Sequence, residues 1–330
     1  MWTTRPSQFN SSTVPGRSGA TPPICDFVPV FRVSQFVEIA RPKINLTLQV
    51  LGKLPDGYHA LASLVAFADG PADRVTLDCA SPRGLTVTGP FADDIHGNNL
   101  LETVLERVTE AAHVATGDSG KFQTGHVYLE KCLPVAAGIG GGSADAAALL
   151  RALRAANRDL AAVIDWNAIA LRLGADVPVC LLNRAAFMTG IGEHLTPIAN
   201  FPRLPVVLVN PLTTVPTDKT ARVFRTLAAK PLPASGIDPQ APASLTREML
   251  IGLIDGGNDL EPAACRVVPE IVDVLDQLRS TSQCRVAAMS GAGPTCFAVF
   301  DDEAATIEAV EHLRMRRPQW WISAAVLAHV

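Results

Sequence analysis

Apolar and polar residues alternate strictly between residues 43 and 50, with apolar residues at every even position. A period of two is typical of a half-buried strand with one apolar face. The opposite face of this strand would display Lys43 and Asn45 side by side. Pro55-Asp56-Gly57 then predicts a turn, and Tyr58 and His59 follow it directly.

A period of three to four residues predicts helices further along the chain. The segments 100–112 and 166–173 have this spacing, and Gly174 would end the second helix. A third, alanine-rich helix would follow Ser143. We expect Ser143 to be its N-cap and Asp145 to lie in its first turn.

Apolar runs predict further strands at 127–129, 206–209 and 296–300, and a helix should open at Pro262. Helices and strands mix without the regular alternation of a parallel array, so the expected fold class is α+β with two lobes. The expected organisation is a disordered N-terminal tail at 1–32, an N-terminal domain at 33–190 and a C-terminal domain at 191–330.

Composition narrows the function classes. The 330 residues are 48% hydrophobic and 18% charged, which allows a substantial core, and the net charge of −4 leaves no basic footprint for nucleic acid. No uncharged apolar run reaches membrane-spanning length. The seven cysteines are odd in number and lack a Cys-x-x-Cys pair, so a disulfide framework or a zinc site is not favoured. We therefore expect a cytoplasmic protein without nucleic-acid or membrane partners; no oligomeric state is assigned.

Four glycines within five positions make 138–142 the most informative segment. A strand, a glycine turn and a helix N-terminus form an anion site, and phosphate is its usual occupant. The hydroxyl of Ser143 could reach a phosphate or Mg²⁺. The expected cofactors are therefore Mg²⁺ and a phosphate-bearing molecule, which the family resemblance given below implies is ATP; no protein residue is assigned as a metal ligand. A tight connection without any ligand is the alternative. The segment fits neither a Walker P-loop nor a dinucleotide fingerprint.

Three segments resemble the motifs of the GHMP kinases, which phosphorylate galactose, homoserine, mevalonate and related alcohols. They are Ala40–Leu46 (ARPKINL), Pro134–Ala147 (PVAAGIGGGSADAA) and Ser290–Phe297 (SGAGPTCF), in the family's order. The resemblance spans the chain from about residue 33. It implies the two-lobed GHMP kinase fold, with an N-terminal ribosomal-protein-S5-domain-2-like lobe and a C-terminal ferredoxin-like α/β lobe.

Further matches narrow the resemblance to one branch of the family. Asp56-Gly-Tyr-His59 and Leu173–Pro178 (LGADVP) are similar to the branch that phosphorylates a tertiary hydroxyl of 4-diphosphocytidyl-2-C-methyl-D-erythritol in the non-mevalonate isoprenoid pathway. The implied partner is thus a small alcohol linked to cytidine diphosphate.

The resemblance also implies a role for each site residue. Asp176 would accept the proton of the attacking hydroxyl, and Lys43 would stabilise charge near it. Asn45, Tyr58, His59 and Thr217 would bind the substrate, with Tyr58 stacking on the cytosine. ATP would contact Lys131, Pro134, Val135, Ala136, Ala137, Gly138, Ile139, Gly140, Gly141, Gly142, Ser143 and Ala144.

Each assignment has a structural alternative. Asp176 could cap the helix that Pro178 opens, Lys43 could be solvated charge, and Tyr58 with His59 could be hairpin packing. The chain also departs from the branch pattern, because no aromatic residue directly follows Thr217 and Phe224 is the nearest ring.

Three other functions compete with this interpretation: another kinase of the family such as a homoserine kinase, a decarboxylase of the diphosphomevalonate type, or a nucleotide-sensing protein without catalysis. A stacking tyrosine has no use on a small amino-acid alcohol. The presence of both Lys43 and Asp176 argues against lost catalysis.

Overall fold

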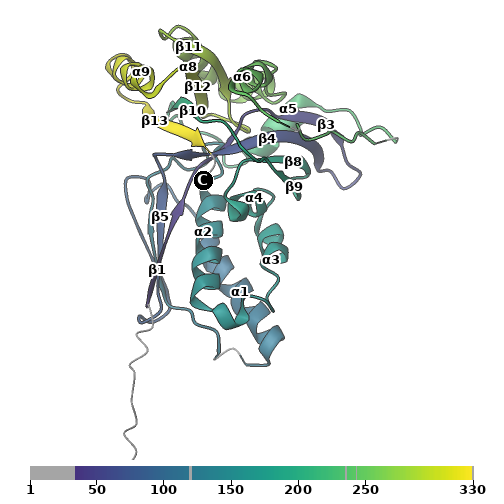
Figure 1. The fold of residues 1–330 in the computed structure, drawn as a ribbon, viewed down its shortest axis with the longest axis vertical. Coiled ribbons are helices and arrows are strands. Elements are labelled where there is room, and N and C mark those ends of the chain that lie inside the picture. The colour runs from purple at the N-terminus through teal and green to yellow at the C-terminus, as the bar shows by residue number, and fades with distance from the viewer. Residues whose placement is uncertain (1–33, 119–120, 235, 243, 329–330) are drawn as a thin grey trace, which may run out of the picture. The chain divides into compact units, whose positions relative to one another are not determined.

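Two antiparallel-rich sheets and a set of helices build the fold in this computed structural model (Figure 1). The structure describes residues 34–118, 121–234, 236–242 and 244–328. The predicted tail at 1–32 lies outside these residues. No helix among the described residues has both the length and the apolar character needed to cross a bilayer.

The smaller sheet has four strands in the order β1-β5-β7-β6. Their bounds are β1 Gln35–Ala40, β5 Asp73–Asp78, β7 His126–Glu130 and β6 Gly84–Thr88. Four helices accompany this sheet: α1 Leu100–Thr116, α2 Gly141–Ala156, α3 Trp166–Leu173 and α4 Val177–Leu182. The alanine-rich α2 packs against β1 and β5 and also against α1 and α4. Its small side chains allow these close approaches, so α2 lies at the centre of a buried apolar cluster.

The larger sheet has nine strands, with β4 near its centre. The path β11-β12-β10-β13-β4-β8-β9 comprises Cys284–Met289, Cys296–Phe300, Leu204–Asn210, Trp321–Ala328, His59–Asp69, Ala186–Gly190 and His194–Pro197. Two short strands, β2 Lys43–Asn45 and β3 Gln49–Lys53, also pair with β4. The 11-residue β4 therefore holds the first predicted motif next to strands from late in the chain.

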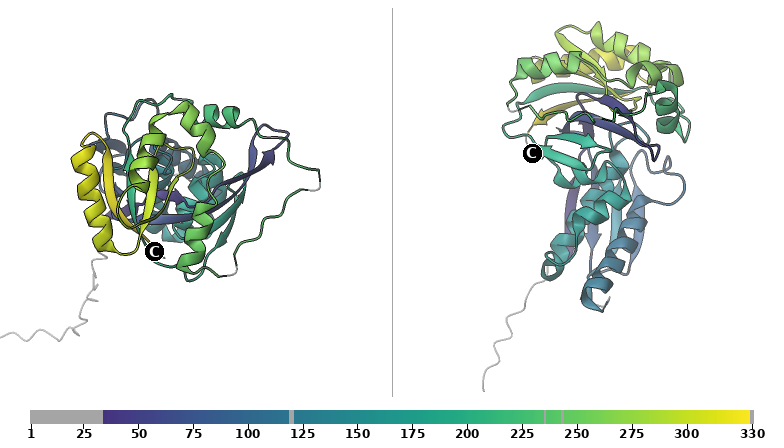
Figure 2. Two further views of the ribbon diagram at one scale, coloured as in Figure 1. Left: turned by 90° about the horizontal axis from the view of Figure 1, so that it is seen from above. Right: turned by 90° about the vertical axis from the view of Figure 1, so that its right-hand side faces the viewer.

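Five helices come from the second half of the chain: α5 Lys219–Leu227, α6 Arg247–Asp255, α7 Glu261–Val267, α8 Glu270–Arg279 and α9 Glu303–Arg316. Helices α6, α8 and α9 pack on β10–β13, and Figure 2 shows these green to yellow helices around the sheet. Helices α8 and α9 share one apolar cluster, whereas α6 belongs to the cluster on the opposite face of the sheet. Two apolar clusters occupy this part of the fold.

The expected α+β class is confirmed, together with most of the predicted elements. Helix α3 spans the predicted residues and ends at Gly174. Strand β12 also has its predicted bounds. The predicted domain boundary near residue 190 falls in the connection between β8 and β9, which pair with each other. The residues from Ser34 onward form one compact unit, and the division into two domains stays a prediction.

Several local predictions are wrong. The strand expected at 43–50 is broken, because the N–H groups of Leu46 and Thr47 both point to the Leu64 carbonyl, as in a bulge. Its supposed open polar face is also closed, since Lys43 and Asn45 are both buried.

Helix α2 starts before Ser143 and not after it. Gly140 is the N-cap in a left-handed conformation (φ 64°), so Ser143 is already inside the first turn. Asp145 consequently lies beyond that turn, where it is buried. Glycine adopts positive φ without a steric penalty, which is why the helix can begin inside the glycine segment.

Candidate active site

Lys43 and Asp176 form an ion pair at the head of α2. The Lys43 Nζ lies 2.8 Å from the Asp176 Oδ1. The lysine side chain is 4% exposed, whereas the aspartate side chain is 37% exposed. One carboxylate oxygen is thus held by a buried ammonium, while the group remains accessible to a ligand.

The Asp176 side chain does not act as a helix cap, which was its alternative role. Asp176 occupies the N-cap position of α4, but its carboxylate accepts no capping hydrogen bond there. Pro178 in the first turn leaves one fewer N–H to satisfy. The carboxylate instead turns toward Lys43, which comes from β2.

The glycine turn runs directly beside this pair. The Lys43 N–H donates to the Ile139 carbonyl over 2.9 Å. A Cβ placed on Gly140 would lie 3.4 Å from the Lys43 Cε and 3.9 Å from the Asp176 Oδ2. The turn, the ammonium and the carboxylate therefore converge on one place.

The first turn of α2 offers backbone donors at the same place. The first intrahelical bond runs from the Ala144 N–H to the Gly140 carbonyl. The N–H groups of Gly141, Gly142 and Ser143 therefore have no acceptor within the helix. Such groups, with the positive end of the helix dipole, can bind an anion.

The first and third predicted motifs hold the glycine turn in place. The Ser290 hydroxyl accepts from the Asn45 N–H over 3.1 Å and donates to the Gly138 carbonyl over 3.1 Å. A Cβ on Gly138 would come within 2.5 Å of the Gly293 carbonyl oxygen, so only glycine fits there. The Thr295 N–H donates to the Ala137 carbonyl. Segments more than 150 positions apart thus form one backbone cluster.

Asn45 contributes to this cluster through its side chain as well. Its amide Nδ2 donates to the Ser63 hydroxyl over 2.7 Å. Its Oδ1 is buried and has no hydrogen-bond partner among the described residues. The predicted contact between Asn45 and the substrate stays a prediction.

Lys131 is buried between two carboxylates next to the same helix. Its Nζ lies 2.6 Å from the Asp73 Oδ2 and 2.6 Å from the Asp145 Oδ2. Burial and the nearby Asp73 carboxylate raise the pKa of Asp145 to about 8. Burial alone would lower the pKa of Lys131, but the two carboxylates outweigh it and raise this pKa. Burial in this cluster therefore favours the protonated form of Asp145. The predicted contact of Lys131 with ATP stays a prediction.

Tyr58 and His59 lie at the β3–β4 hairpin, close to α5. Tyr58 is exposed, whereas the His59 ring stacks on Phe224 with centroids 4.6 Å apart and an interplanar angle of 25°. Burial and the nearby Lys53 charge lower the pKa of His59, so its imidazole is neutral near pH 7. Thr217 lies just before α5 and is exposed. The surroundings of this helix thus offer two aromatic side chains, one neutral imidazole and one hydroxyl to a ligand.

The chain matches known proteins over most of its length. The sequence model for the GHMP kinases N terminal domain matches residues 99–184, and the one for the GHMP kinases C terminal domain matches residues 244–315. A 4-diphosphocytidyl-2-C-methyl-D-erythritol kinase of Rhodopseudomonas palustris is 46% identical over 300 residues, covering 88% of this chain and 96% of that protein. The kinase of the same name from Parvibaculum lavamentivorans is 44% identical over 291 residues, covering 87% and 97%.

The chain belongs to the GHMP kinase family. A solved structure of 4-(cytidine 5′-diphospho)-2C-methyl-D-erythritol kinase superimposes on it with a TM-score of 0.68, at 34% identity over 89% of this chain and 100% of that one. A homoserine kinase from Cytophaga hutchinsonii has the same fold, with a TM-score of 0.60 at 16% identity. The predicted family and two-lobed fold are confirmed, and the protein is an ATP-dependent kinase.

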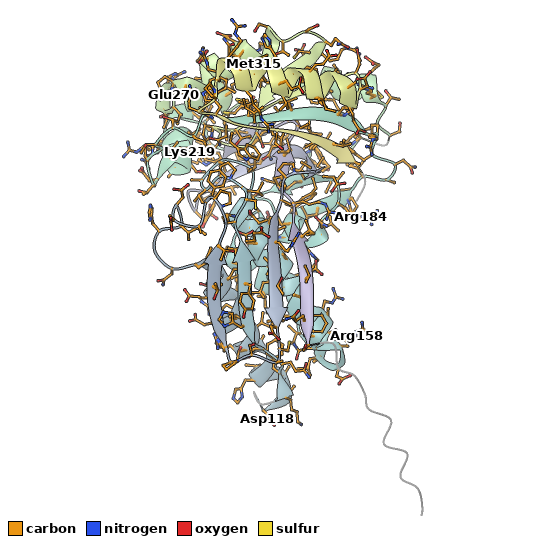
Figure 3. All side chains as sticks on the ribbon, turned by 90° about the vertical axis from the view of Figure 1, so that its left-hand side faces the viewer. Asp118, Arg158, Arg184, Lys219, Glu270 and Met315 are labelled. Atoms are coloured by element: carbon orange, nitrogen blue, oxygen red, sulfur yellow. The ribbon has the colours of Figure 1, made fainter. Side chains whose placement is uncertain are left out.

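Sequence reasoning missed two residues of this GHMP kinase site. Asp73 anchors the segment before the glycine turn, because its Oδ1 accepts from the N–H groups of Cys132 and Leu133 over 2.6 and 2.8 Å. Lys219, the first residue of α5, is buried and donates to the Ala136 and Gly293 carbonyls. Figure 3 labels Lys219 at the edge of the upper, helix-covered half of the GHMP kinase fold. The only hint in the sequence that this segment is unusual was that no aromatic residue directly follows Thr217, where the branch pattern has one.

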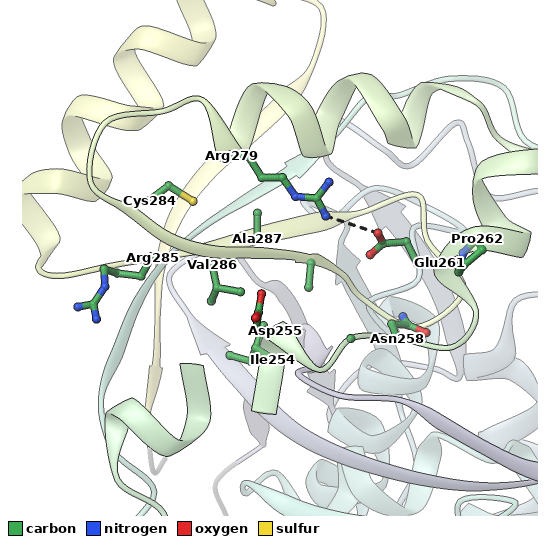
Figure 4. Close-up of a pocket in the computed structure, with 12 residues that line it drawn as sticks. Ile254, Asp255, Asn258, Glu261, Pro262, Arg279, Cys284, Arg285, Val286 and Ala287 are labelled. Atoms are coloured by element: carbon green, nitrogen blue, oxygen red, sulfur yellow. Dashed lines mark ion pairs between the residues drawn. The ribbon is translucent and has the colours of Figure 1, made fainter. Parts of the chain in front are cut away.

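A hollow of about 410 Å³ lies elsewhere in this GHMP kinase, between α6, α8 and β11. Figure 4 shows Asp255, Asn258 and the Arg279–Glu261 ion pair around it. None of the predicted site residues lines this hollow. It presents neither a lysine–carboxylate pair nor the head of a long helix, so its geometry does not make it the reaction site.

Proposed function

We propose that this kinase transfers the γ-phosphoryl group of ATP to a tertiary hydroxyl of 4-diphosphocytidyl-2-C-methyl-D-erythritol. The observation that carries the proposal is the Lys43–Asp176 pair beside the free N–H groups of α2. Relatives that are 42–46% identical to this chain are named 4-diphosphocytidyl-2-C-methyl-D-erythritol kinase.

Phosphoryl transfer requires mostly positioning and charge stabilisation. The accessible Asp176 carboxylate would accept the proton of the attacking hydroxyl. Lys43 orients that carboxylate through their 2.8 Å contact and would offset the charge that builds up near it. The N–H groups of Gly141–Ser143 would bind the phosphates.

Mg²⁺ would arrive with the nucleotide, where it neutralises phosphate charge. Mg²⁺ keeps several waters and phosphate oxygens as ligands, so one or two protein oxygens are enough. The partly exposed Ser143 hydroxyl lies in the first turn of α2 and fits such a ligand. No group of three His, Cys, Asp or Glu side chains in the described ranges could form a separate metal site.

The cytidine moiety would bind at the β3–β4 hairpin and α5. The exposed Tyr58 ring is free to stack on a base, and the neutral His59 can hydrogen-bond to its edge. Phe224 supports the His59 ring by stacking. Thr217 supplies a hydroxyl at the start of α5. We further propose a cytoplasmic location, which fits the free thiols of all six cysteines in the described ranges.

ADP release against a panel of alcohols tests this function. Purified protein is incubated with ATP, Mg²⁺ and either 4-diphosphocytidyl-2-C-methyl-D-erythritol, homoserine or diphosphomevalonate, and the products are identified by mass spectrometry. We expect ADP and a phosphorylated product with the first compound only. Preferential turnover of homoserine would assign the chain to another branch, and release of carbon dioxide from diphosphomevalonate would indicate the decarboxylase.

A further inference from the structure

Lys219 is a buried cation that, among the residues described by the structure, contacts backbone carbonyl groups and no carboxylate. Only 4% of this residue is exposed. Its Nζ donates to the Ala136 carbonyl over 3.0 Å and to the Gly293 carbonyl. Within the described ranges it forms no ion pair, and burial lowers its pKa to about 8. A buried charge without a counter-ion is costly, and its persistence needs an explanation.

Three lysines in the described ranges lie beside the glycine turn or the segment just before it, and two of them are paired with carboxylates. Lys43 is paired with Asp176, and Lys131 is shared by two carboxylates. The turn itself carries no charged side chain between Gly138 and Ser143. Among the residues that the structure describes, the ammonium of Lys219 is therefore the positive charge near the turn that no carboxylate compensates.

The contact with Ala136 also fixes a peptide of the predicted phosphate segment. Ala136 has a φ of 54°, a left-handed conformation that is strained for a non-glycine residue. In a trans peptide the N–H group points opposite to the carbonyl. Holding the Ala136 carbonyl toward Lys219 therefore also fixes the direction of the Ala137 N–H group.

We propose that Lys219 is a positioning residue of the nucleotide site, which fixes the Ala136 peptide and supplies positive charge that the phosphates of ATP offset on binding. This inference rests on the proposed kinase function and concerns the nucleotide alone. A triphosphate would provide the counter-charge that the free protein lacks. The two neighbouring ammonium groups differ from Lys219 in that each already has a carboxylate partner in the free protein.

Binding of ATP and of adenosine to position-219 variants tests the proposal. Dissociation constants are measured by calorimetry for ATP and by NMR titration for adenosine, without any alcohol substrate. Lys219→Met should weaken ATP binding roughly ten- to hundredfold, the effect of losing hydrogen bonds from a charged group. Adenosine binding should change less than about twofold, because adenosine has no phosphate.

Three further variants separate charge from packing. Lys219→Arg keeps the charge and should retain ATP affinity, whereas Lys219→Gln keeps hydrogen-bond donors without charge and should behave like the Met variant. Lys230→Met is the matched control, since Lys230 is exposed. Equal losses for ATP and adenosine, or normal ATP binding by the Gln variant, would overturn the proposal. A wild-type chain that binds no ATP would instead refute the proposed kinase function.

Discussion

The ammonium of Lys43 lies 2.8 Å from the carboxylate of Asp176, although 133 positions separate them in the sequence. Lys43 is fixed by the pairing of β2 with β4, and Asp176 by the start of α4. The Gly140 backbone lies against both side chains. Two rigid elements thus bring a carboxylate and an ammonium group to the head of α2, an arrangement that suits phosphoryl transfer.

Asp176→Asn should lower kcat by roughly 100- to 10,000-fold, because the amide cannot accept the proton of the attacking hydroxyl. The affinity for ATP should change little, since the phosphates would be bound by the α2 backbone. Steady-state kinetics and ATP titration check the two expectations separately. Asp159→Asn, at an exposed carboxylate, is the matched control. Normal turnover by the Asp176 variant would exclude this residue as the base.

Tyr58→Ala should raise KM for the cytidine-bearing alcohol more than KM for ATP. Loss of one base–aromatic stack typically costs about 1–3 kcal/mol, or roughly 5- to 150-fold in KM. The chain has one other tyrosine, Tyr128 on β7, which is also exposed and serves as the control. Equal changes in both KM values would remove Tyr58 from the base pocket.

Gly138→Ala should destabilise the fold by about 1–3 kcal/mol, because a positive φ of 80° is strained for alanine. The new Cβ would also meet the Gly293 carbonyl oxygen at 2.5 Å. Gly252→Ala is the control, since it has open space inside α6 and should raise stability by up to about 1 kcal/mol. Urea unfolding compares the free energies of unfolding. A Gly138 variant as stable as wild type would contradict the close packing of the two turns.

The raised pKa of Asp145 predicts a pH-dependent stability. Between its ordinary value of 3.8 and about 8, the folded state holds a proton that the unfolded state releases. The free energy of unfolding contributed by this group therefore falls as the pH rises through that window. Asp145→Asn removes this contribution, so the free energy of unfolding of the variant should fall less steeply than that of the wild type between pH 5 and about 8. Parallel stability curves for the two proteins would show that Asp145 is ionised throughout.

Much of the site could be predicted from the sequence because glycine and alternation patterns are local. The turn at Gly138–Ser143 and the helix after it follow from such patterns, and the family resemblance suggested pairing Lys43 with Asp176. Burial of Lys219 could not be predicted, because lysine at the start of a helix is usually solvated and only tertiary contacts exclude water from it. The start of α2 was misplaced because serine is a good N-cap, whereas Gly140 adopts the required left-handed conformation at lower cost.

A crystal structure with a non-hydrolysable ATP analogue and Mg²⁺ would show whether the head of α2 binds the phosphates. We expect the N–H groups of Gly141–Ser143 to donate to the phosphates, with the γ-phosphate adjacent to Lys43 and Asp176. Phosphates bound at the hollow lined by Arg279, or a γ-phosphate remote from both side chains, would contradict this expectation.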